Sequence, residues 1–285
     1  MTFLASHLVQ NILRELGQVE LLHQFTATGG TATTFINTEF GNFETPPDQD
    51  VFKNYLLIVV RDAGGAGASP ENKWSVVSAY DDVVYTGTMA TVIDDIASGD
   101  TIMLAKQDKY PLPHILNAIN QGLQQLGDIP SNKDVTLTTV TNQIVYDVPV
   151  AVKRGLKRVE IEIDDDEWEI VHDVRNELTG ANSASKIYIE GYDSGLSIGL
   201  VYDGVHSVIS AYNDVINEYI HPSVATCASI LKLLEWFNRR DANQDPNSYE
   251  LWLEGQYRDV FLPRALGMNP IKKEKKSPKY FTRGI

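Results

Sequence analysis

The sequence is poor in cysteine and in long apolar runs, and each shortage excludes a class of protein. Its 285 residues include one cysteine, Cys227, so an internal disulfide is excluded. The small neighbours of Cys227 predict a small buried residue in place of a reactive thiol. The best apolar run, residues 55–60, has strand length and falls short of the roughly 20 residues that a membrane-spanning helix needs. We therefore expect no membrane span.

Export signals are also missing from the sequence. The first residues lack the basic and apolar segments of a signal peptide, and no Asn-x-Ser/Thr acceptor for glycosylation occurs. We therefore expect synthesis in the cytoplasm.

Basic residues are outnumbered by acidic ones. The chain has 24 Lys and Arg against 38 Asp and Glu, a net charge of −14. Such a charge repels phosphate and disfavours nucleic-acid binding over the whole surface of the protein. Residues 271–285 hold six basic residues and one acidic residue, a net +5, which leaves 18 and 37, a net −19, in the other 270. The chain is thus an acidic body with a basic C-terminal tail.

Hydrophobic residues make up 43% of the chain, and their spacing switches between helical and strand periods. We predict an α+β fold, with antiparallel β regions of sandwich or barrel type interleaved with a helical bundle, and an extended C-terminal tail. The predicted parts are an N-terminal helix (1–20), a first β region (21–108), the central helix of a helical core (109–134), a second β region (135–206), the rest of the helical core (207–266) and the basic tail (267–285).

Helical periodicity is clearest at residues 3–16 and 112–127, where apolar residues recur on one side and polar residues on the other. Pro111 and Pro113 are typical of a helix start, and Gly127 is typical of a helix end. Three further helices are expected at 208–220, 224–239 and 249–262.

Strand periodicity is clearest in the second β region. Val159, Ile161 and Ile163 alternate with charged residues, so one face of that sheet is predicted to face water. In the first β region, the glycine-rich stretch 61–70 follows a strand pattern. No Gly-Lys-Ser/Thr follows it, and the next segment is again a strand, so we expect a mobile hairpin tip in place of a phosphate loop.

Motifs for catalysis and metal binding are weak. Residues 195–199 match the G-x-S-x-G pattern around Ser197, but a strand pattern runs through them, whereas a nucleophile elbow needs a strand followed by a helix. Residues 164–167 (Asp-Asp-Asp-Glu) lack the spacing of a calcium loop and indicate a charged hairpin turn. The six histidines are scattered. We expect no catalytic residues, no metal site, no cofactor and no enzyme activity.

The segments around the central helix resemble those of a bacteriophage protein family. Residues 98–104 (Ser-Gly-Asp-Thr-Ile-Met-Leu) precede the helix, whose residues 116–127 read Leu-Asn-Ala-Ile-Asn-Gln-Gly-Leu-Gln-Gln-Leu-Gly. Strand segments at 143–149 and 156–163 follow. In the order of their elements and the pattern of their residue types, residues from about 85 to 265 resemble the head-tail adaptor (neck or connector) proteins of tailed bacteriophages.

The resemblance implies a structural protein of the virion neck. Such a protein forms a homo-oligomeric ring of twelve copies below the portal protein, connects the capsid to the tail or to other neck proteins, and lines the path of DNA during ejection. DNA would pass through the lumen without specific binding, which suits an acidic body. The first β region, 21–108, is an insertion relative to the smaller adaptors.

The basic tail is the candidate partner-binding segment. In that family the C-terminal segment often docks on the portal, and this tail has no apolar period of its own. A solvated end and a DNA contact are the alternatives. The candidate residues for binding the portal or a neighbouring subunit are Lys272, Lys273, Lys275, Lys276, Lys279, Tyr280, Phe281 and Arg283.

A second hypothesis is a tail or baseplate component whose β regions bind a receptor or another protein. A trimer or a six-fold ring would favour it over the twelve-fold connector. Its candidate stacking aromatics are Trp74, Tyr80, Tyr85, Trp168, Tyr188 and Tyr192.

Overall fold

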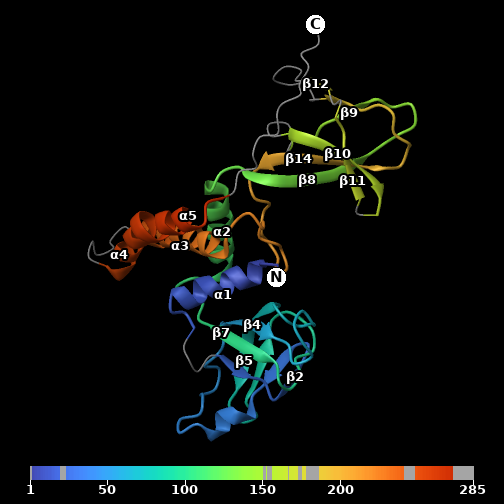
Figure 1. The fold of residues 1–285 in the computed structure, drawn as a ribbon. Helices are drawn as coiled ribbons and strands as arrows, with labels where there is room; N and C mark the ends of the chain where they lie inside the picture. Colours follow the sequence, from blue (N-terminus) through green and yellow to red (C-terminus); the bar gives the residue numbers. More distant parts are fainter. Residues whose placement is uncertain are drawn as a thin grey trace. The chain divides into compact units, whose positions relative to one another are not determined.

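The computed structural model describes residues 2–19, 24–149, 152, 156–165, 167–172, 175–177, 186–240 and 248–271 (Figure 1). It has the predicted mixed α+β architecture, with helices and antiparallel sheets. Internal contacts divide the chain into two compact units. The first unit combines Met1–Gln125 with Ser207–Pro270, and the second contains Leu126–His206.

The β part of the first unit is a seven-stranded antiparallel sheet in the order β1-β7-β4-β5-β6-β3-β2. Its two outermost strands, β1 and β2, are consecutive in the chain and separated only by Ala27 and Thr28. One short segment therefore reaches both edges, and the sheet curls into a barrel. The elements are β1 (Gln24–Thr26), β2 (Gly29–Thr31), β3 (Thr34–Ile36), the 3₁₀ helix η2 (Thr38–Asn42), β4 (Leu56–Arg61), β5 (Trp74–Asp81), β6 (Thr86–Met89) and β7 (Thr101–Ala105).

Aromatic and aliphatic side chains fill the barrel. Phe35 pairs with Gly87 across β3 and β6, and a Cβ on Gly87 would lie 2.0 Å from the Phe35 ring. Phe40 of η2 contacts the rings of Phe52 and Tyr80 at centroid distances of 5.6 and 6.3 Å. The buried core residues are Ala27, Phe35, Phe40, Phe52, Leu57, Val59, Val77, Tyr80, Met89, Ile93, Ile96, Ile102 and Leu104.

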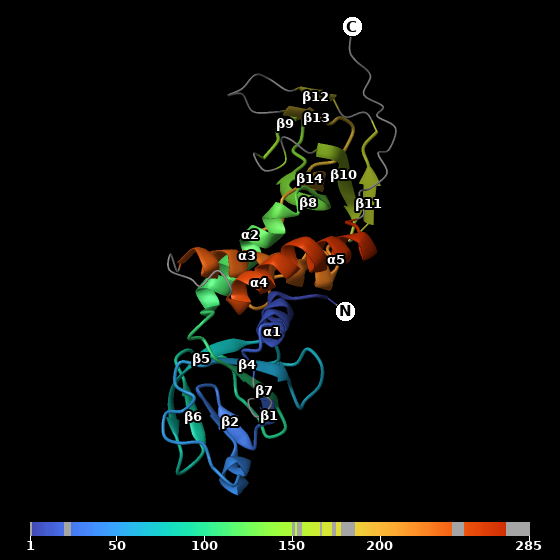
Figure 2. The same cartoon turned by 90° about the vertical axis from the view of Figure 1, so that its left-hand side faces the viewer.

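Apart from η2, the helices of the first unit gather around α3, which contacts each of them (Figure 2). No helix in the described part of the chain is long and apolar enough to cross a membrane. The last three elements follow one another without a break. The helices are α1 (Ala5–Glu15), α2 (Leu112–Gln125), α3 (Pro222–Arg240), α4 (Tyr249–Gln256), the π-helical turn η3 (Tyr257–Phe261) and α5 (Leu262–Met268).

Helices α2 and α3 approach each other closely at Gly122. A Cβ on Gly122 would lie 2.8 Å from the carbonyl carbon and oxygen of Ala228 and 2.9 Å from the amide nitrogen of Ser229. The neighbouring α3 residues are small, and the buried Ser229 hydroxyl donates to the Ala225 carbonyl oxygen at 2.7 Å, so its polar group is satisfied. Glycine is required here because the obstacle is backbone, which cannot move aside as a side chain can.

The helix predicted at 208–220 is wrong, and so is the helical assignment at the start of the 207–266 region. This segment is an irregular connection to α3. Asn120 of α2 holds it in place: its amide donates to the Ile209 carbonyl oxygen at 2.9 Å and its Oδ1 accepts from the Ile209 amide at 2.7 Å. The Asp214 carboxylate accepts from the amides of Ser210 and Ala211, which competes with helical hydrogen bonds.

Two further predicted boundaries are corrected. The central helix region, 109–134, is too long, because α2 ends at Gln125 and strand β8 begins at Ile129. Gly127 lies between them with φ of 84°, as expected for a glycine that ends a helix. The last predicted helix, 249–262, is too short, since the helical run continues to Met268.

The second unit is a sandwich of two antiparallel sheets. A four-stranded sheet has the order β11-β10-β14-β8, and a three-stranded sheet has the order β12-β13-β9. Residues of both sheets form one core, which includes Tyr146, Val159, Ile161, Ile187 and Leu200. The strands are β8 (Ile129–Thr138), β9 (Val145–Asp147), β10 (Leu156–Asp164), β11 (Glu167–Ile170), β12 (Arg175–Glu177), β13 (Lys186–Tyr188) and β14 (Ser197–Gly204).

The helix crossing makes a prediction about two glycines. Gly122→Ala should lower the free energy of unfolding by about 1–3 kcal/mol, because the new methyl group meets the α3 backbone. Gly255→Ala on α4, where no atom lies within 4 Å of an added Cβ, should raise it by about 0.5–1 kcal/mol through helix propensity. Urea unfolding measures both. Equal effects of the two substitutions would show that the α2–α3 approach is not tight.

Candidate interaction surface

The eight tail residues predicted to bind a partner lie outside the described residues. The described chain ends at Ile271, three residues after α5. The interaction surfaces of the described residues therefore belong to the acidic body. The tail residues concerned are Lys272, Lys273, Lys275, Lys276, Lys279, Tyr280, Phe281 and Arg283.

Ser197 lies at the beginning of strand β14 and pairs with Thr138 of β8. The strand continues to Gly204, so the strand-turn-helix geometry of a nucleophile elbow is absent at this residue. Asp203, an acid that follows Ser197 in the sequence, forms an ion pair with Lys157 at 2.7 Å. The G-x-S-x-G match is therefore part of a strand, and it provides no support for a hydrolase.

The other sequence motifs occupy turns. Asp164 pairs with Glu167 where β10 turns into β11, as a charged hairpin requires. The glycine-rich stretch connects β4 to β5, and carboxylates of the loop accept its amides: Asp62 accepts from Gly64 at 2.6 Å. Amides used in this way are not available to a phosphate. Among the described residues, no group of three or more His, Cys, Asp or Glu is placed to hold a metal ion.

Cys227 lies on α3 and is partly exposed, less buried than the sequence predicted. Burial raises the pKa of its thiol, and the nearby Glu15 carboxylate raises it further. The thiol therefore stays protonated near neutral pH, which agrees with an unreactive cysteine.

The candidate stacking aromatics do not form one platform. They are split between the two units, three in each. Tyr80 is 1% exposed inside the barrel, and burial raises its pKa to about 12. Trp74 packs edge-on against Tyr212 with ring centroids 5.9 Å apart. Tyr85 and Tyr192 pack against the cores of the first and second unit.

Trp168 belongs to a cluster on the outer face of the four-stranded sheet. Its ring lies over Gly199, where an added Cβ would be 2.9 Å from the indole, and Lys133 Nζ lies 3.0 Å from the ring centroid. Lys133 also pairs with Glu160 at 2.9 Å. Burial would raise the pKa of Glu160, but hydrogen bonds from Lys133 and Arg158 hold it below its ordinary value. Trp168 thus covers Gly199 of the central strand β14, which is a structural role.

A shallow pocket of about 210 Å³ lies in the second unit, lined by Asn142, Gln143, Tyr192 and neighbours. Ligand pockets for small molecules typically have volumes of about 300–1,000 Å³. The hydroxyl of Tyr146, also in the lining, donates to the Gln143 carbonyl oxygen at 2.8 Å and accepts from the Val140 amide at 3.1 Å. The hydroxyl group of Tyr146 is therefore already engaged in holding the loop that contains Val140 and Gln143.

The strongest candidate for an interaction surface lies on the last helical run of the first unit. Besides Leu251, five apolar side chains there are 40–70% exposed, and three of them are aromatic. The rings of Tyr249 and Trp252 lie 5.6 Å apart. We call this set the α4–α5 surface, and its members are Tyr249, Trp252, Val260, Phe261 and Met268.

The π turn η3 helps to place these residues on one side. In an unbroken α-helix, Val260 would be rotated by about 80° from Trp252, eight residues earlier, since each residue turns by about 100°. The wider turn at Tyr257–Phe261 delays the rotation and brings Val260 back toward the side of Trp252. Tyr257 itself points inward, is 6% exposed and has a pKa raised by burial.

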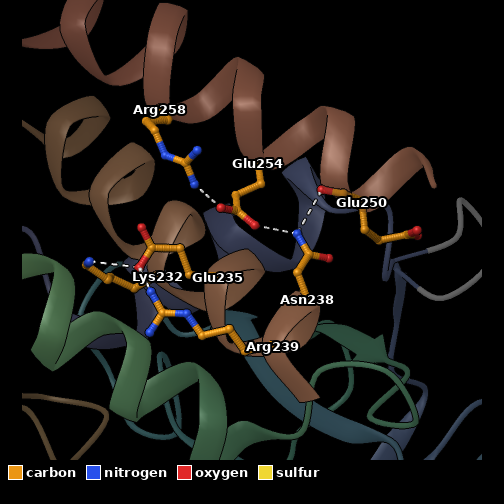
Figure 3. A network of polar contacts seen from close by, with 7 residues as sticks. All are labelled: Lys232, Glu235, Asn238, Arg239, Glu250, Glu254 and Arg258. Carbon is orange, nitrogen blue, oxygen red and sulfur yellow. Dashed lines mark hydrogen bonds and ion pairs between the residues drawn. The ribbon is translucent and has the colours of Figure 1, made fainter. Parts of the chain in front are cut away.

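The opposite side of this helix is attached to α3 by polar groups (Figure 3). Glu254 is 7% exposed, accepts from Asn238 Nδ2 at 2.5 Å and pairs with Arg258. Asn238 also donates to the Glu250 carbonyl oxygen at 3.3 Å. A neighbouring carboxylate, Glu235 of α3, pairs with Lys232 at 2.9 Å and Arg239 at 3.7 Å (Figure 3).

The start of α4 is also tied to the segment that precedes α2. Lys109 forms an ion pair with Glu250, and its ammonium lies 5.1 Å from the ring centroid of Phe237 and 5.4 Å from that of Tyr110. The hydrogen bond from Lys109 lowers the pKa of Glu250. α4 thus has charged groups on its packed side and aromatic groups toward solvent, the reverse of an ordinary amphipathic helix.

The sequence pattern predicted this stretch as part of the helical core, and the exposed surface was not predicted. Apolar residues occur on both sides of the helix: Tyr257 is buried, while Trp252 and Val260 are exposed. Apolar residues on both sides of one helix could have indicated the exposed surface, because a helix with one packed side needs only one apolar stripe.

The ion pair of Glu250 predicts a pH dependence. Because the folded-state pKa of Glu250 is lowered, its pairing stabilises the fold above the unfolded-state pKa of about 4.3 and is lost as pH falls through the folded value. Lys109→Met should therefore cost about 0.5–1 kcal/mol at pH 7 and almost nothing near pH 3. Lys53→Met, whose pair with Asp50 is 3.9 Å long and exposed, is the control. Urea unfolding across this pH range checks both, and a cost for Lys109→Met that does not change with pH contradicts the pairing.

Comparison with models of known protein families found no match, and comparison with curated proteins also found none. A functional proposal for this chain therefore starts from its own surfaces. Of those described, the α4–α5 surface has the composition of an interface core, with Tyr, Trp, Phe and Met exposed together.

Proposed function

We propose that the chain is a structural, non-enzymatic head-tail adaptor of a tailed bacteriophage. In this role it forms a ring in the virion neck below the portal protein, connects the capsid to the tail or to other neck proteins, and surrounds the path of DNA during ejection. It would be made in the host cytoplasm and then assembled into the particle.

The observation that carries the proposal is the α4–α5 surface. Its three aromatic side chains are 40–63% exposed, and at about 150–250 Å² each they present on the order of 300 Å² to solvent. Val260 and Met268 extend that area. A specific interface uses about 800 Å² per partner, and its energy is concentrated in residues such as Trp and Tyr. The surface thus has the size and composition of the centre of an interface between subunits.

The rigidity of this surface also suits assembly. Glu254, Asn238 and Arg258 fix the helix to α3, and Lys109 fixes its first turn. Side chains that are already ordered lose little entropy when a partner binds. An interface of this kind is preorganised in the single chain.

The arrangement of the β regions is consistent with a connector. The barrel is inserted between α1 and α2, and the sandwich is inserted between α2 and α3. A helical core of this kind can form the contacts between subunits while the loops of the inserted β regions reach capsid, portal or tail proteins. The resemblance of residues 85–265 to head-tail adaptors points to the same role.

The charge distribution supports a passage for DNA without specific binding. Residues 1–270 carry a net −19, and a wall with that sign repels phosphate instead of holding it. The basic tail, net +5 over residues 271–285, remains the proposed contact for the portal or a neighbouring subunit.

Subunit stoichiometry tests the proposal directly. Native mass spectrometry and class averages of purified neck assemblies should show twelve copies of this chain in a closed ring next to the portal. A trimer or a six-fold ring at the tail tip would instead favour a tail or baseplate component with a receptor-binding β domain. A chain absent from the neck contradicts the adaptor role.

The α4–α5 surface is tested by one substitution. Trp252→Asp should weaken association between subunits by about 30-fold or more, because a tryptophan at an interface centre contributes about 2 kcal/mol or more. The fold should persist, since Trp252 is 56% exposed in the single chain. Val92→Asp, at a position 71% exposed in the barrel, introduces the same charge elsewhere and should leave association unchanged. Sedimentation velocity measures the association, and equal behaviour of the two variants excludes the α4–α5 surface as the interface.

A further inference from the structure

A second exposed surface lies on the barrel, at the 3₁₀ helix η2. Residues 39–53, which include all of η2 but its first residue and the loop after it, lie beside the β5–β6 turn at 81–84. The Asp50 amide donates to the Tyr80 carbonyl oxygen at 3.0 Å, and the Tyr80 amide donates to Asp50 Oδ1 at 3.0 Å. We call this surface the η2 corner, defined as residues 39–53 and 81–84.

The η2 corner exposes apolar side chains. Val83 is 79% exposed and Val84 is 55% exposed at the tip of the turn. Phe43 and Val51, in the neighbouring loop, are 37% and 42% exposed. Four apolar side chains from two adjoining segments are therefore exposed to solvent, and exposed apolar groups of this kind occur at sites for another chain.

The same corner is strongly acidic. It contains six carboxylates and one ammonium group, a net charge of −5. The ammonium group belongs to Lys53, and its Nζ lies 3.9 Å from Oδ2 of Asp50. The carboxylates belong to Glu39, Glu44, Asp48, Asp50, Asp81 and Asp82.

The C-terminal segment of the chain has the complementary chemistry. Residues 272–285 contain six basic residues and one acidic residue, a net +5, which matches the −5 of the corner. The segment also carries two adjacent aromatic residues, Tyr280 and Phe281, suited to the exposed valines. A basic and aromatic peptide is thus the partner that an acidic and apolar surface would select.

We propose that residues 272–285 of one copy of this chain dock on the η2 corner of a second copy. The basic side chains would pair with the rim of carboxylates, and Tyr280 and Phe281 would cover Val83 and Val84. The proposal goes beyond the adaptor role, because it requires only a second copy and names the segment and surface that meet.

A second copy is favoured over the same copy by the layout of the first unit. In Figures 1 and 2, α5, which precedes the tail, and the short blue helix η2 lie on opposite sides of this unit, with α1 and barrel strands between them. A tail leaving α5 would have to pass around the barrel to reach its own corner. Docking on a neighbour joins two different surfaces, a contact that repeats from copy to copy and closes into a ring or extends as a stack.

Carbodiimide cross-linking of the full-length protein tests the proposal. Copies labelled with ¹⁵N are mixed with unlabelled copies, and cross-linked peptides are identified by mass spectrometry. Links between tail lysines and corner carboxylates should join labelled to unlabelled chains, and their yield should fall at high salt because the attraction is screened. Links found only within one copy, or tail links to other surfaces, overturn the proposal.

Charge reversal provides a stricter form of the test. Asp48→Lys with Asp82→Lys should reduce the mixed links at the four remaining corner carboxylates by about tenfold, because two favourable pairs become repulsive. Mixing this variant with a tail variant carrying Lys276→Glu and Lys279→Glu should restore them, since each variant complements the other. Asp165→Lys with Glu167→Lys, on the exposed β10–β11 turn, changes charge equally and is the control.

The outcomes separate this proposal from the adaptor role. A neck ring that contains the chain but shows no links between tail and corner overturns the docking and leaves the adaptor role standing. Links between copies in a protein absent from the neck support the docking and contradict the adaptor role. Failure of the complementary mixture to restore the links overturns the docking even where the single variants reduce them.

Discussion

The close crossing of α2 and α3 is the constraint on which the rest of the chain depends. Gly122 lets the backbone of α2 approach Ala228 and Ser229 so closely that any side chain there would meet main-chain atoms. α2 ends where the second β region begins, and α3 starts after that region returns. The crossing therefore holds together the two chain segments that flank the insertion. Because α1, α4 and α5 also pack on α3, the same contact supports the helix that carries the exposed aromatics.

On α4, the polar groups that stabilise the fold lie on the packed side, and the aromatic groups suited to interaction lie on the exposed side. A buried carboxylate is costly unless its partners satisfy it, and Glu254 has both an amide and a guanidinium. Exposed aromatics contribute little to the fold of a single chain, yet Tyr249 and Trp252 are placed outward. A sequence selected for the stability of the monomer alone would reverse these positions. The inversion is explained when Trp252 is buried by another subunit.

Local patterns predicted the elements that are regular over many residues, such as α2 and the alternating strand β10. They failed where side chains from distant segments decide the backbone. Residues 208–220 have apolar spacing that suits a helix, but Asn120, about 90 positions earlier, takes the Ile209 backbone hydrogen bonds. The role of Gly199 depends on Trp168 in another strand. The α4–α5 surface was missed because one sequence does not show which of two apolar sides faces a partner.

The two proposed surfaces differ in the physics of their contacts. Apolar association at the α4–α5 surface depends on removing area from water and is little weakened by salt, whereas pairing at the η2 corner is screened. Apolar burial supplies most of the affinity, and charge complementarity supplies direction and selects against wrong partners. Since the basic tail and the acidic corner are separate parts of the sequence, a pair of copies joined by one such contact still offers one free tail and one free corner. Under the proposed docking, addition of copies stops when the last free tail meets the last free corner, which closes either a reciprocal pair or a larger ring.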